Sequence, residues 1–112
     1  MTRKYFVLEL GHGVDLRGSD STKAAARAVN DAIHSGSLYV KDYVDDFDKV
    51  YVEVTVAVPR PETVRTDEVL AVLPVGQKSI QVVEGGLAYP YREGSSDEVI
   101  IAVAAVRVLL EV

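Results

Sequence analysis

The sequence predicts an α+β fold, a two-layer sandwich in which a mixed sheet of about four strands carries two helices on one face. Three observations predict this class. Apolar and other residues alternate over 4–10 and 49–58, and apolar residues fill 98–112, as is typical of strands. Between the first two of these segments, alanines repeat at helical spacing. A short second helix and a further strand complete the expected order β-α-β-α-β-β.

The composition is that of an ordinary globular chain, which we expect to form one domain over residues 1–112. Apolar residues make up 48% and charged residues 26% of the sequence, a balance that disfavours disorder. The formal net charge of −5 provides no basic surface for a nucleic acid backbone. The chain has no cysteine, no membrane-spanning apolar run and no signal-peptide core, so we expect no disulfide, no membrane partner and a cytoplasmic location.

The first predicted strand, Lys4–Leu10, leads into a turn rich in glycine. Phe6, Leu8 and Leu10 give the strand one apolar face. The turn Gly11–Gly18 follows, and its three glycines permit positive φ or the close approach of a ligand to the backbone. The turn is therefore the segment in which we look first for a functional site.

A helix is predicted from about Ser21 to Ser35. Its start is marked by four consecutive residues that can accept hydrogen bonds from free amides of the first turn, namely Ser19, Asp20, Ser21 and Thr22. Its predicted buried face is rich in alanine, which lets a helix lie close to a sheet, and consists of Ala24, Ala25, Ala28, Val29, Ala32 and Ile33. Gly36 is the expected C-terminal stop.

The middle of the chain combines an irregular segment with two regular ones. Ser37–Asp48 mixes aromatic and acidic residues, which indicates a surface loop or, alternatively, a rim around a pocket or subunit contact. Lys49–Val58 is predicted as a strand with valines along one face, and Pro59 and Pro61 end it. A short helix is expected over Thr66–Leu73.

The segments that follow are expected to be extended. Lys78–Glu84 is predicted as the third strand, and two glycines after it indicate a bulge, a bend or a close backbone contact. Leu87–Tyr91 continues extended, and Arg92–Asp97 forms a polar loop.

The last segment, Glu98–Val112, predicts self-association. Its two faces are apolar except for Arg107 and Glu111 on one of them, and a strand of this kind is covered on both sides. Two helices cannot cover both faces of a four-stranded sheet. We therefore predict a homo-oligomer in which another subunit buries the second face.

The glycine-rich turn is the candidate ligand site. Backbone amides at a helix N-terminus attract anions, and the guanidinium of Arg17 can bind a phosphate or carboxylate through two hydrogen bonds. A small anionic metabolite is the expected ligand, and the predicted binding residues are Gly11, Gly13, Asp15, Arg17, Gly18 and Lys23. The alternative is a structural turn in which Asp15 accepts from backbone amides and pairs with Arg17.

Two further chemistries are considered for the same turn. Histidine is a common acid–base side chain in enzymes and Asp15 can orient His12, so these two residues are the candidates for acid–base catalysis. A second subunit or the loop at Tyr89–Arg92 would complete their cavity. A metal centre is disfavoured, because His12 and Asp15 are too few ligands and Arg17 repels a cation. No pattern identifies a cofactor, which stays unknown.

The turn also resembles a known signature. Residues 11–18 read GHGVDLRG, which is similar to the GxGxDxHG motif near the N-terminus of a small uncharacterised family of conserved bacterial proteins with longer plant members. Gly11, Gly13, Asp15 and Gly18 match the motif, whereas Arg17 stands where the family has histidine. Residues 73–76 and 84–87 are also similar, so the resemblance spans most of the chain. It implies a site at the turn without naming its chemistry.

Two functions follow from these observations. The first is an oligomeric enzyme or binder of a small molecule, with pockets at subunit junctions. The second is a non-catalytic structural or interaction module in which the turn only seats the helix. Open space beside Asp15 favours the first function, and packing of the protein's own atoms around the turn favours the second.

Overall fold

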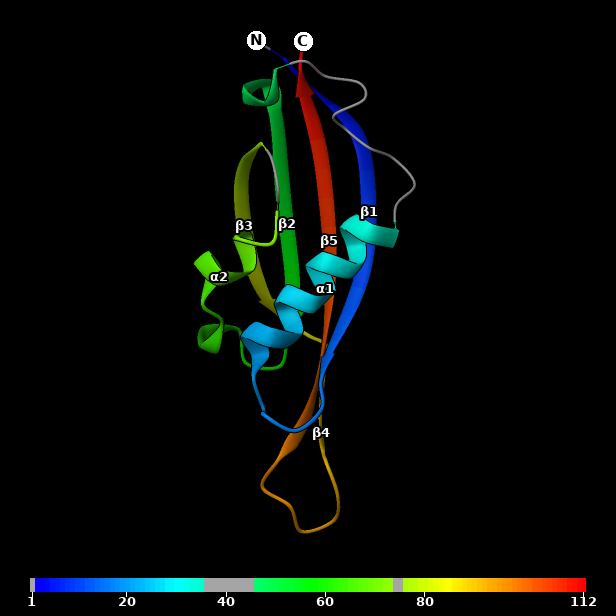
Figure 1. Cartoon of the computed structure of the whole chain (residues 1–112), viewed down its shortest axis with the longest axis vertical. Helices are drawn as coiled ribbons and strands as arrows, with labels where there is room; N and C mark the ends of the chain where they lie inside the picture. The colour runs from blue at the N-terminus through cyan, green and yellow to red at the C-terminus, as the bar shows by residue number, and fades with distance from the viewer. Residues whose placement is uncertain (1, 36–45, 74–75) are drawn as a thin grey trace.

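The computed structural model describes residues 2–35, 46–73 and 76–112. Five strands and two helices lie in these ranges: β1 (Arg3–Asp15), α1 (Ser21–Ser35), β2 (Val50–Val58), α2 (Thr66–Leu70), β3 (Gln77–Glu84), β4 (Leu87–Pro90) and β5 (Glu98–Glu111) (Figure 1). Short 3-10 turns at Phe47–Lys49 and Pro61–Thr63 flank β2. Most of Ser37–Asp48, predicted as a loop or pocket rim, lies outside the described residues, as does Gly36.

A single mixed sheet contains all five strands. β5 lies antiparallel to β1 on one side and to β2 on the other, and β3 continues the sheet parallel to β2. β4 pairs with the first residues of β5, beyond the end of β2. The predicted α+β class and order of elements are confirmed, and β4 brings the sheet from about four strands to five.

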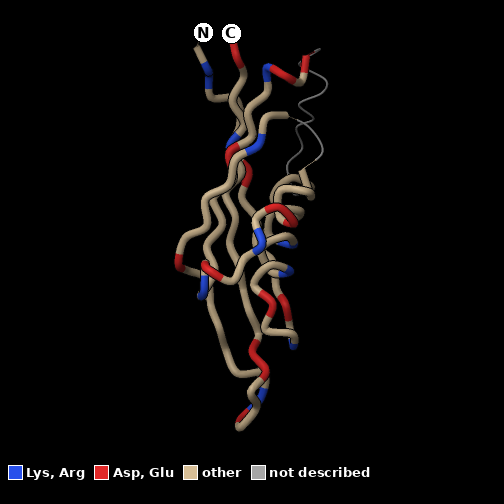
Figure 2. The backbone as a smooth tube through the Cα atoms, turned by 90° about the vertical axis from the view of Figure 1, so that its left-hand side faces the viewer, with Lys and Arg blue, Asp and Glu red and all other residues tan. Residues whose placement is uncertain are grey.

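The two helices lie on the same side of the sheet. In Figure 1 they lie in front of the strands, and in Figure 2, turned by 90°, the strands and the helices form separate layers. The molecule is a thin plate of 54 × 25 × 18 Å. We call the sheet surface opposite the helices the open face. Its side chains include Leu8 and Leu10 of β1, Ile101, Val103, Ala105 and Arg107 of β5, Glu53 and Thr55 of β2, Ser79 and Gln81 of β3, and Leu87 of β4.

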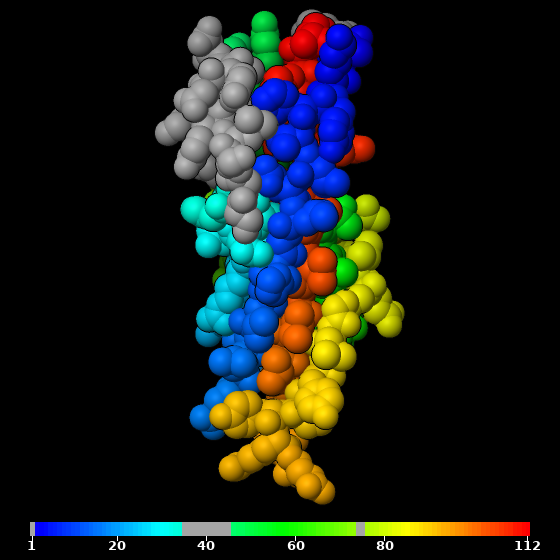
Figure 3. Space-filling view, turned by 90° about the vertical axis from the view of Figure 1, so that its right-hand side faces the viewer, coloured from blue at the N-terminus to red at the C-terminus, as the bar shows by residue number. Residues whose placement is uncertain are grey.

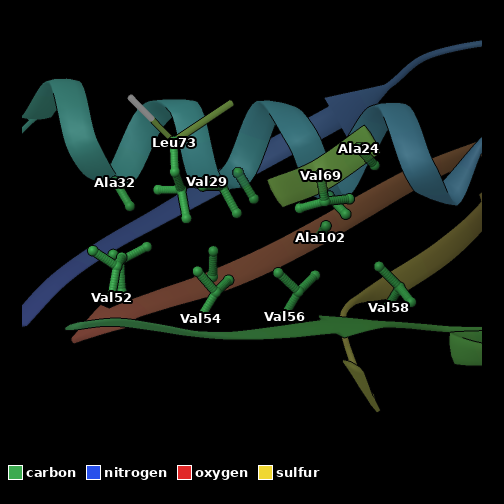
Figure 4. Close-up of a cluster of buried hydrophobic side chains, with 14 of the residues drawn as sticks. Ala24, Val29, Ala32, Val52, Val54, Val56, Val58, Val69, Leu73 and Ala102 are labelled. Atoms are coloured by element: carbon green, nitrogen blue, oxygen red, sulfur yellow. The ribbon is translucent and has the colours of Figure 1, made fainter. Parts of the chain in front are cut away.

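The core lies between the helices and the sheet. Figure 4 shows Val52 to Val58 of β2 pointing toward α1 and toward Val69 and Leu73. These valines alternate with less buried residues, because successive side chains of a strand point to opposite faces. Full burial of a valine side chain stabilises the fold by about 1.5–3 kcal/mol relative to its exposure. The alternation in β2 therefore determines which sheet face the helices cover.

β1 is longer than the sequence predicted. The strand was expected to end at Leu10 and to be followed by a turn from Gly11, but it continues to Asp15. The pairing explains the difference, because β5 provides a partner for every residue from Val7 to Asp15, which lies opposite Ile100. The turn between β1 and α1 is consequently shorter and spans residues 16–20.

α2 is shorter than predicted. The helix was expected to reach Leu73, but it ends at Leu70. After it, the amides of Val72 and Leu73 donate to the carbonyls three residues back, so the chain tightens into a 3-10-like turn. This turn still places Leu73 in the core, at 4% exposure.

The two consecutive glycines after β3 make the close backbone contact that the sequence suggested. The amide of Gly85 donates to the carbonyl of Val58 at 2.9 Å. Gly86 has a φ of +67°, and a Cβ there would collide with the carbonyl of Ile101. The chain crosses the end of β2 at this point and enters the β4–β5 hairpin, which projects from one end of the molecule (Figures 1 and 3).

Candidate functional site

Gly11 and Gly13 of β1 lie directly beneath the backbone of α1. A Cβ at Gly11 would come within 3.0 Å of backbone atoms of Ala28 and Ala32. A Cβ at Gly13 would come equally close to backbone atoms of Ala24 and Ala28. At these two predicted binding residues, the space beside the strand is filled by the helix, and the contacts support close helix–sheet packing.

Asp15 is buried at the end of β1, with 6% of its surface exposed. Its carboxylate accepts a hydrogen bond from the amide of Asp20 at 2.9 Å. The guanidinium of Arg27 lies 3.5 Å from the other carboxylate oxygen and also donates to the carbonyl of Val14 at 2.6 Å. A Cβ at Gly18 would come within 2.9 Å of the Asp15 carboxylate. The amide hydrogen bond that the alternative of a structural turn predicted is therefore present, but the arginine beside Asp15 is Arg27 of α1 and not Arg17.

Arg17 connects the turn to the β4–β5 hairpin. Its guanidinium lies 4.8 Å from the ring centroid of Tyr91, in a cation–π contact, instead of pairing with the buried carboxylate. The hydroxyl of Ser19, a residue with a φ of +51°, accepts a hydrogen bond from the amide of Glu98 at 3.0 Å. The turn thus lies against the segment Tyr89–Arg92, which the sequence proposed as part of a shared cavity.

The start of α1 is capped by the protein's own side chains. The carboxylate of Asp20 accepts from the amide of Lys23 at 3.0 Å, which makes Asp20 the N-cap. The hydroxyl of Thr22 accepts from the amide of Arg65 at 3.0 Å. Arg65 itself pairs with Glu68, whose hydrogen bond and negative charge raise the pKa of the guanidinium. The side chain of Lys23 extends from this helix start into solvent.

The two histidines and Asp15 have separate partners. The backbone amide of His12 donates to the carboxylate of Asp31 at 3.0 Å, and the His12 ring lies 3.7 Å from the same oxygen. Nδ1 of His34 lies 2.8 Å from the carbonyl of Asn30, within the last turns of α1. His12 and Asp15 share no hydrogen bond. Within residues 2–35, 46–73 and 76–112, no three His, Asp or Glu side chains gather closely enough to hold a metal ion.

A second surface feature, which the sequence did not identify as a site, lies on the open face. A hollow of about 510 Å³ spans the strands there, beside Leu8, Thr55 and Ser79. At its edge, Nε of Arg107 donates to the carboxylate of Glu53 at 2.9 Å, and Nη2 of the same arginine also contacts that carboxylate. The sequence contained one signal for it, because Arg107 is one of two charged residues, with Glu111, on a face of the last strand that is otherwise apolar.

The end of the β4–β5 hairpin forms another hollow, of about 540 Å³, lined by Tyr89, Pro90, Tyr91, Arg92 and Glu93. Figure 3 shows this end projecting beyond the strands and α1. Because Tyr91 lies under the guanidinium of Arg17, the hairpin hollow and the glycine-rich turn are neighbours.

The fold and these surfaces define a class of protein, a small α+β sandwich with helices on one sheet face and an uncovered second face. The chain belongs to the Lin0512 family of conserved hypothetical proteins, which matches residues 5–108. The resemblance of the chain to such a family is therefore confirmed.

The chain is similar to an FtsZ-like protein of unknown function from Nostoc punctiforme PCC 73102, for which a crystal structure exists. The two are 40% identical, with a TM-score of 0.84, over 100% of this chain and 99% of the Nostoc chain. No curated protein matches. Neither helix in the described ranges is long and apolar enough to cross a membrane.

Proposed function

We propose that this protein is a self-associating module whose copies pack together through the open face. One observation carries the proposal: large apolar side chains lie exposed on this face, along the edge strand β1 and its neighbour β5. Leu10 is 62% exposed, Leu8 45% and Val103 48%, and all three lie on the adjacent strands β1 and β5. Leu87 of β4, 50% exposed and opposite Ile101, extends the apolar strip. A large contiguous apolar patch on a folded protein is typical of an interaction surface.

The charges on the open face favour a second copy as the partner. Arg107 pairs with Glu53. Near the chain termini, Arg3 lies 3.7 Å from the ring centroid of Tyr51, and the Tyr51 hydroxyl donates to Glu111. In a symmetric dimer, each patch is covered by the same patch of its partner, so an unpaired charge on it would be buried without a partner. Each of these charged side chains has a partner within the chain: Arg107 pairs with Glu53, and Arg3 and Glu111 both contact Tyr51.

The dimensions of the open face are sufficient for a stable interface. The outline of the plate, 54 × 25 Å, encloses on the order of 1,000 Å², whereas a standard interface buries about 800 Å² per partner. Figure 3 shows β1 and β5 running side by side along the length of the molecule. A partner that covers most of the open face would therefore bury an area typical of specific association.

The glycine-rich segment has a structural role in this proposal. Gly11 and Gly13 seat α1, and Asp15 with Gly18 closes the turn that leads into it. These contacts support the view that the segment positions the helix layer on one face and leaves the other face for association.

Light scattering coupled to size-exclusion chromatography tests the proposal. We expect the wild-type protein at micromolar concentration to exceed the monomer mass of 12.2 kDa, and Leu10→Lys to be monomeric because a charge would be buried at the interface. Leu16→Lys is the matched control, since Leu16 is also 62% exposed but lies in the turn. A wild-type protein that is only monomeric would refute self-association.

A second candidate function is binding of a small anion at the turn, supported by the exposed guanidinium held over Tyr91. In this proposal Arg17 binds a phosphate or carboxylate, Lys23 adds positive charge, and Gly18 keeps the backbone accessible. The hairpin hollow provides adjoining space. Acid–base chemistry by His12 would require a reacting group brought in by the ligand or by a second subunit.

Thermal-shift measurements test the second candidate with phosphate, citrate and nucleotides as probes. We expect an anion to raise the melting temperature of the wild type and not of Arg17→Ala. Arg3→Ala is the control, because Arg3 also lies over a tyrosine ring but is far from the turn along β1. The absence of any shift in the wild type would refute the anion site.

A further inference from the structure

The hollow on the open face combines apolar and polar walls. Strand pairing places Leu8 of β1 beside Arg107 of β5, Arg107 beside Glu53 of β2, and Glu53 beside Ser79 of β3. The adjacent row contributes small side chains, Ala105 and Thr55, which leave the depression between the longer ones. Its volume of about 510 Å³ falls in the range of about 300–1,000 Å³ that is usual for sites of small molecules.

The ion pair at the edge of the hollow leaves hydrogen-bonding groups available. Both Nε and Nη2 of Arg107 contact the same oxygen of Glu53, Oε1. In the part of the chain that the structure describes, Oε2 of Glu53 and Nη1 of Arg107 make no hydrogen bond. The edge of the hollow therefore has one carboxylate oxygen of Glu53 that can accept a hydrogen bond and, on the neighbouring side chain, one guanidinium nitrogen of Arg107 that can donate one.

Packing of a second copy over this face would remove the ion pair from bulk water. A buried charge destabilises an assembly unless its remaining donors and acceptors are satisfied. Of the side chains that line the hollow, Leu8 of β1 and Ala105 of β5 have no hydrogen-bonding group. A polar molecule bound in the hollow would satisfy the remaining groups of Glu53 and Arg107 in the closed assembly.

We propose that the hollow binds a small zwitterion of the amino-acid type, an inference that rests on the proposed self-association. The carboxylate of the ligand binds Arg107 and its ammonium group binds Glu53. The apolar side chain of the ligand lies against Leu8 and Ala105, and the hydroxyls of Thr55 and Ser79 provide further hydrogen bonds. The second copy supplies the wall that encloses the ligand.

Charge balance selects this ligand class. The pair formed by Arg107 and Glu53 is neutral as a whole, so a simple anion would be repelled by Glu53 and a simple cation by Arg107. A zwitterion introduces no net charge and makes a charge-assisted hydrogen bond at each end, which is stronger than the neutral bonds of an uncharged amide.

Titration of the isotope-labelled full chain, followed by NMR, tests the site with alanine, valine, leucine and phenylalanine as probes. We expect at least one of them to shift amide signals of residues 53–55, 79–81 and 105–107. Two analogues of leucine serve as matched ligands: leucinamide lacks the carboxylate charge, and 4-methylpentanoate lacks the ammonium group. Both should bind about tenfold more weakly or worse, because each loses one charged interaction.

Two variants test the assignment of the charges. Arg107→Met keeps the apolar length of the side chain, Glu53→Gln is nearly isosteric, and each should weaken binding of the preferred amino acid by about tenfold or more. Arg3→Met is the control, since Arg3 lies on the same face outside the hollow and should bind as the wild type does. If Arg107→Met does not fold, the comparison of Glu53→Gln with the control decides the question.

Light scattering on the same samples separates the two proposals. The ligand site is supported if the wild type associates and binds an amino acid, and if Arg107→Met and Glu53→Gln both weaken that binding. Association without a signal change for any of the four amino acids overturns the ligand site and leaves the proposed function standing. A monomer that binds overturns self-association but supports the hollow as a site, and a monomer that does not bind overturns both. Equal binding by the wild type, Arg107→Met and Glu53→Gln would also overturn the site.

Discussion

The two glycines of β1 determine how closely α1 approaches the sheet. A methyl group at Gly13 would meet backbone atoms of Ala24 and Ala28, and backbone cannot rotate away as a flexible side chain can. At the other strand positions on this face of the sheet, the residue either carries a side chain or lies past the end of α1. The close packing of α1 on β1 therefore depends on the absence of side chains at Gly11 and Gly13.

Gly13→Ala is expected to lower the free energy of unfolding by about 1–3 kcal/mol, because the helix must shift away from the strand to accommodate the methyl group. Urea denaturation followed by circular dichroism measures the change. Gly18→Ala is the matched control, since its added Cβ would approach only the Asp15 carboxylate, and it should have a smaller effect. Equal stability of Gly13→Ala and the wild type would contradict the close packing.

Asp15→Asn is expected to lower the free energy of unfolding by about 1–2 kcal/mol, because a buried carboxylate that accepts from a backbone amide and faces Arg27 is replaced by a neutral group. Thermal and urea unfolding measure the loss. The exposed Asp48 provides a comparison, since Asp48→Asn should be close to neutral. Unchanged stability in Asp15→Asn would show that the carboxylate is free for another purpose.

At the scale of elements, the start of α1 depends on one cap. Asp20 accepts from the amide of Lys23, and the carbonyl of Asp20 accepts from the amide of Ala24. This cap follows a turn in which Ser19 adopts a positive φ, a conformation that costs free energy for a residue other than glycine. The hydrogen bond from Glu98 to the Ser19 hydroxyl helps to hold that conformation.

Asp20→Ala is expected to lower the free energy of unfolding by about 1 kcal/mol, as loss of an N-cap usually does. The helical signal and the urea midpoint provide the measurement. Asp20→Asn retains an oxygen that can accept from Lys23 and should stay within a few tenths of a kcal/mol of the wild type. A similar loss in both variants would indicate that charge, and not capping, is what matters at this position.

Some elements could be predicted because their pattern is local. In β2 the alternation of valines with other residues identifies a strand without reference to any other segment, and in β5 the long apolar run does so. The length of β1 could not be predicted in this way, because the glycines after Leu10 suggest a turn, whereas pairing with β5 holds them in a strand. The end of α2 likewise depends on the 3-10-like bonds of Val72 and Leu73.

At the scale of the whole molecule, the open face should couple stability to association. Anything that binds only the folded state raises the melting temperature in proportion to the logarithm of its concentration, and a second copy of the chain has this effect on itself. We therefore expect the melting temperature of the wild type to rise with protein concentration, and that of Leu10→Lys to be independent of it.

Differential scanning calorimetry over a hundredfold range of concentration measures this dependence. Leu16→Lys should follow the wild type, since Leu16 lies in the turn and outside the open face. A concentration-independent melting temperature in all three proteins would contradict association through the folded state.

One contact of the turn could be predicted from the sequence. The alternative of a structural turn gave Asp15 a hydrogen bond from a backbone amide, and the amide of Asp20 donates to its carboxylate. The sequence could not indicate that Arg27 would approach this carboxylate while Arg17 stacks on Tyr91, because the first contact requires α1 to pack on β1 and the second joins residues far apart in the chain. The pair of Arg107 and Glu53 was missed for the same reason.

The sequence by itself determined the class of the fold, the order of its elements and the alanine-rich face of α1, because these follow from spacing within short segments. Only the tertiary structure decided that α1 rests on Gly11 and Gly13, in which order the strands lie in the sheet, and which charges pair. The physical reason is that such contacts join residues distant in sequence, and their geometry exists only after the strands have paired.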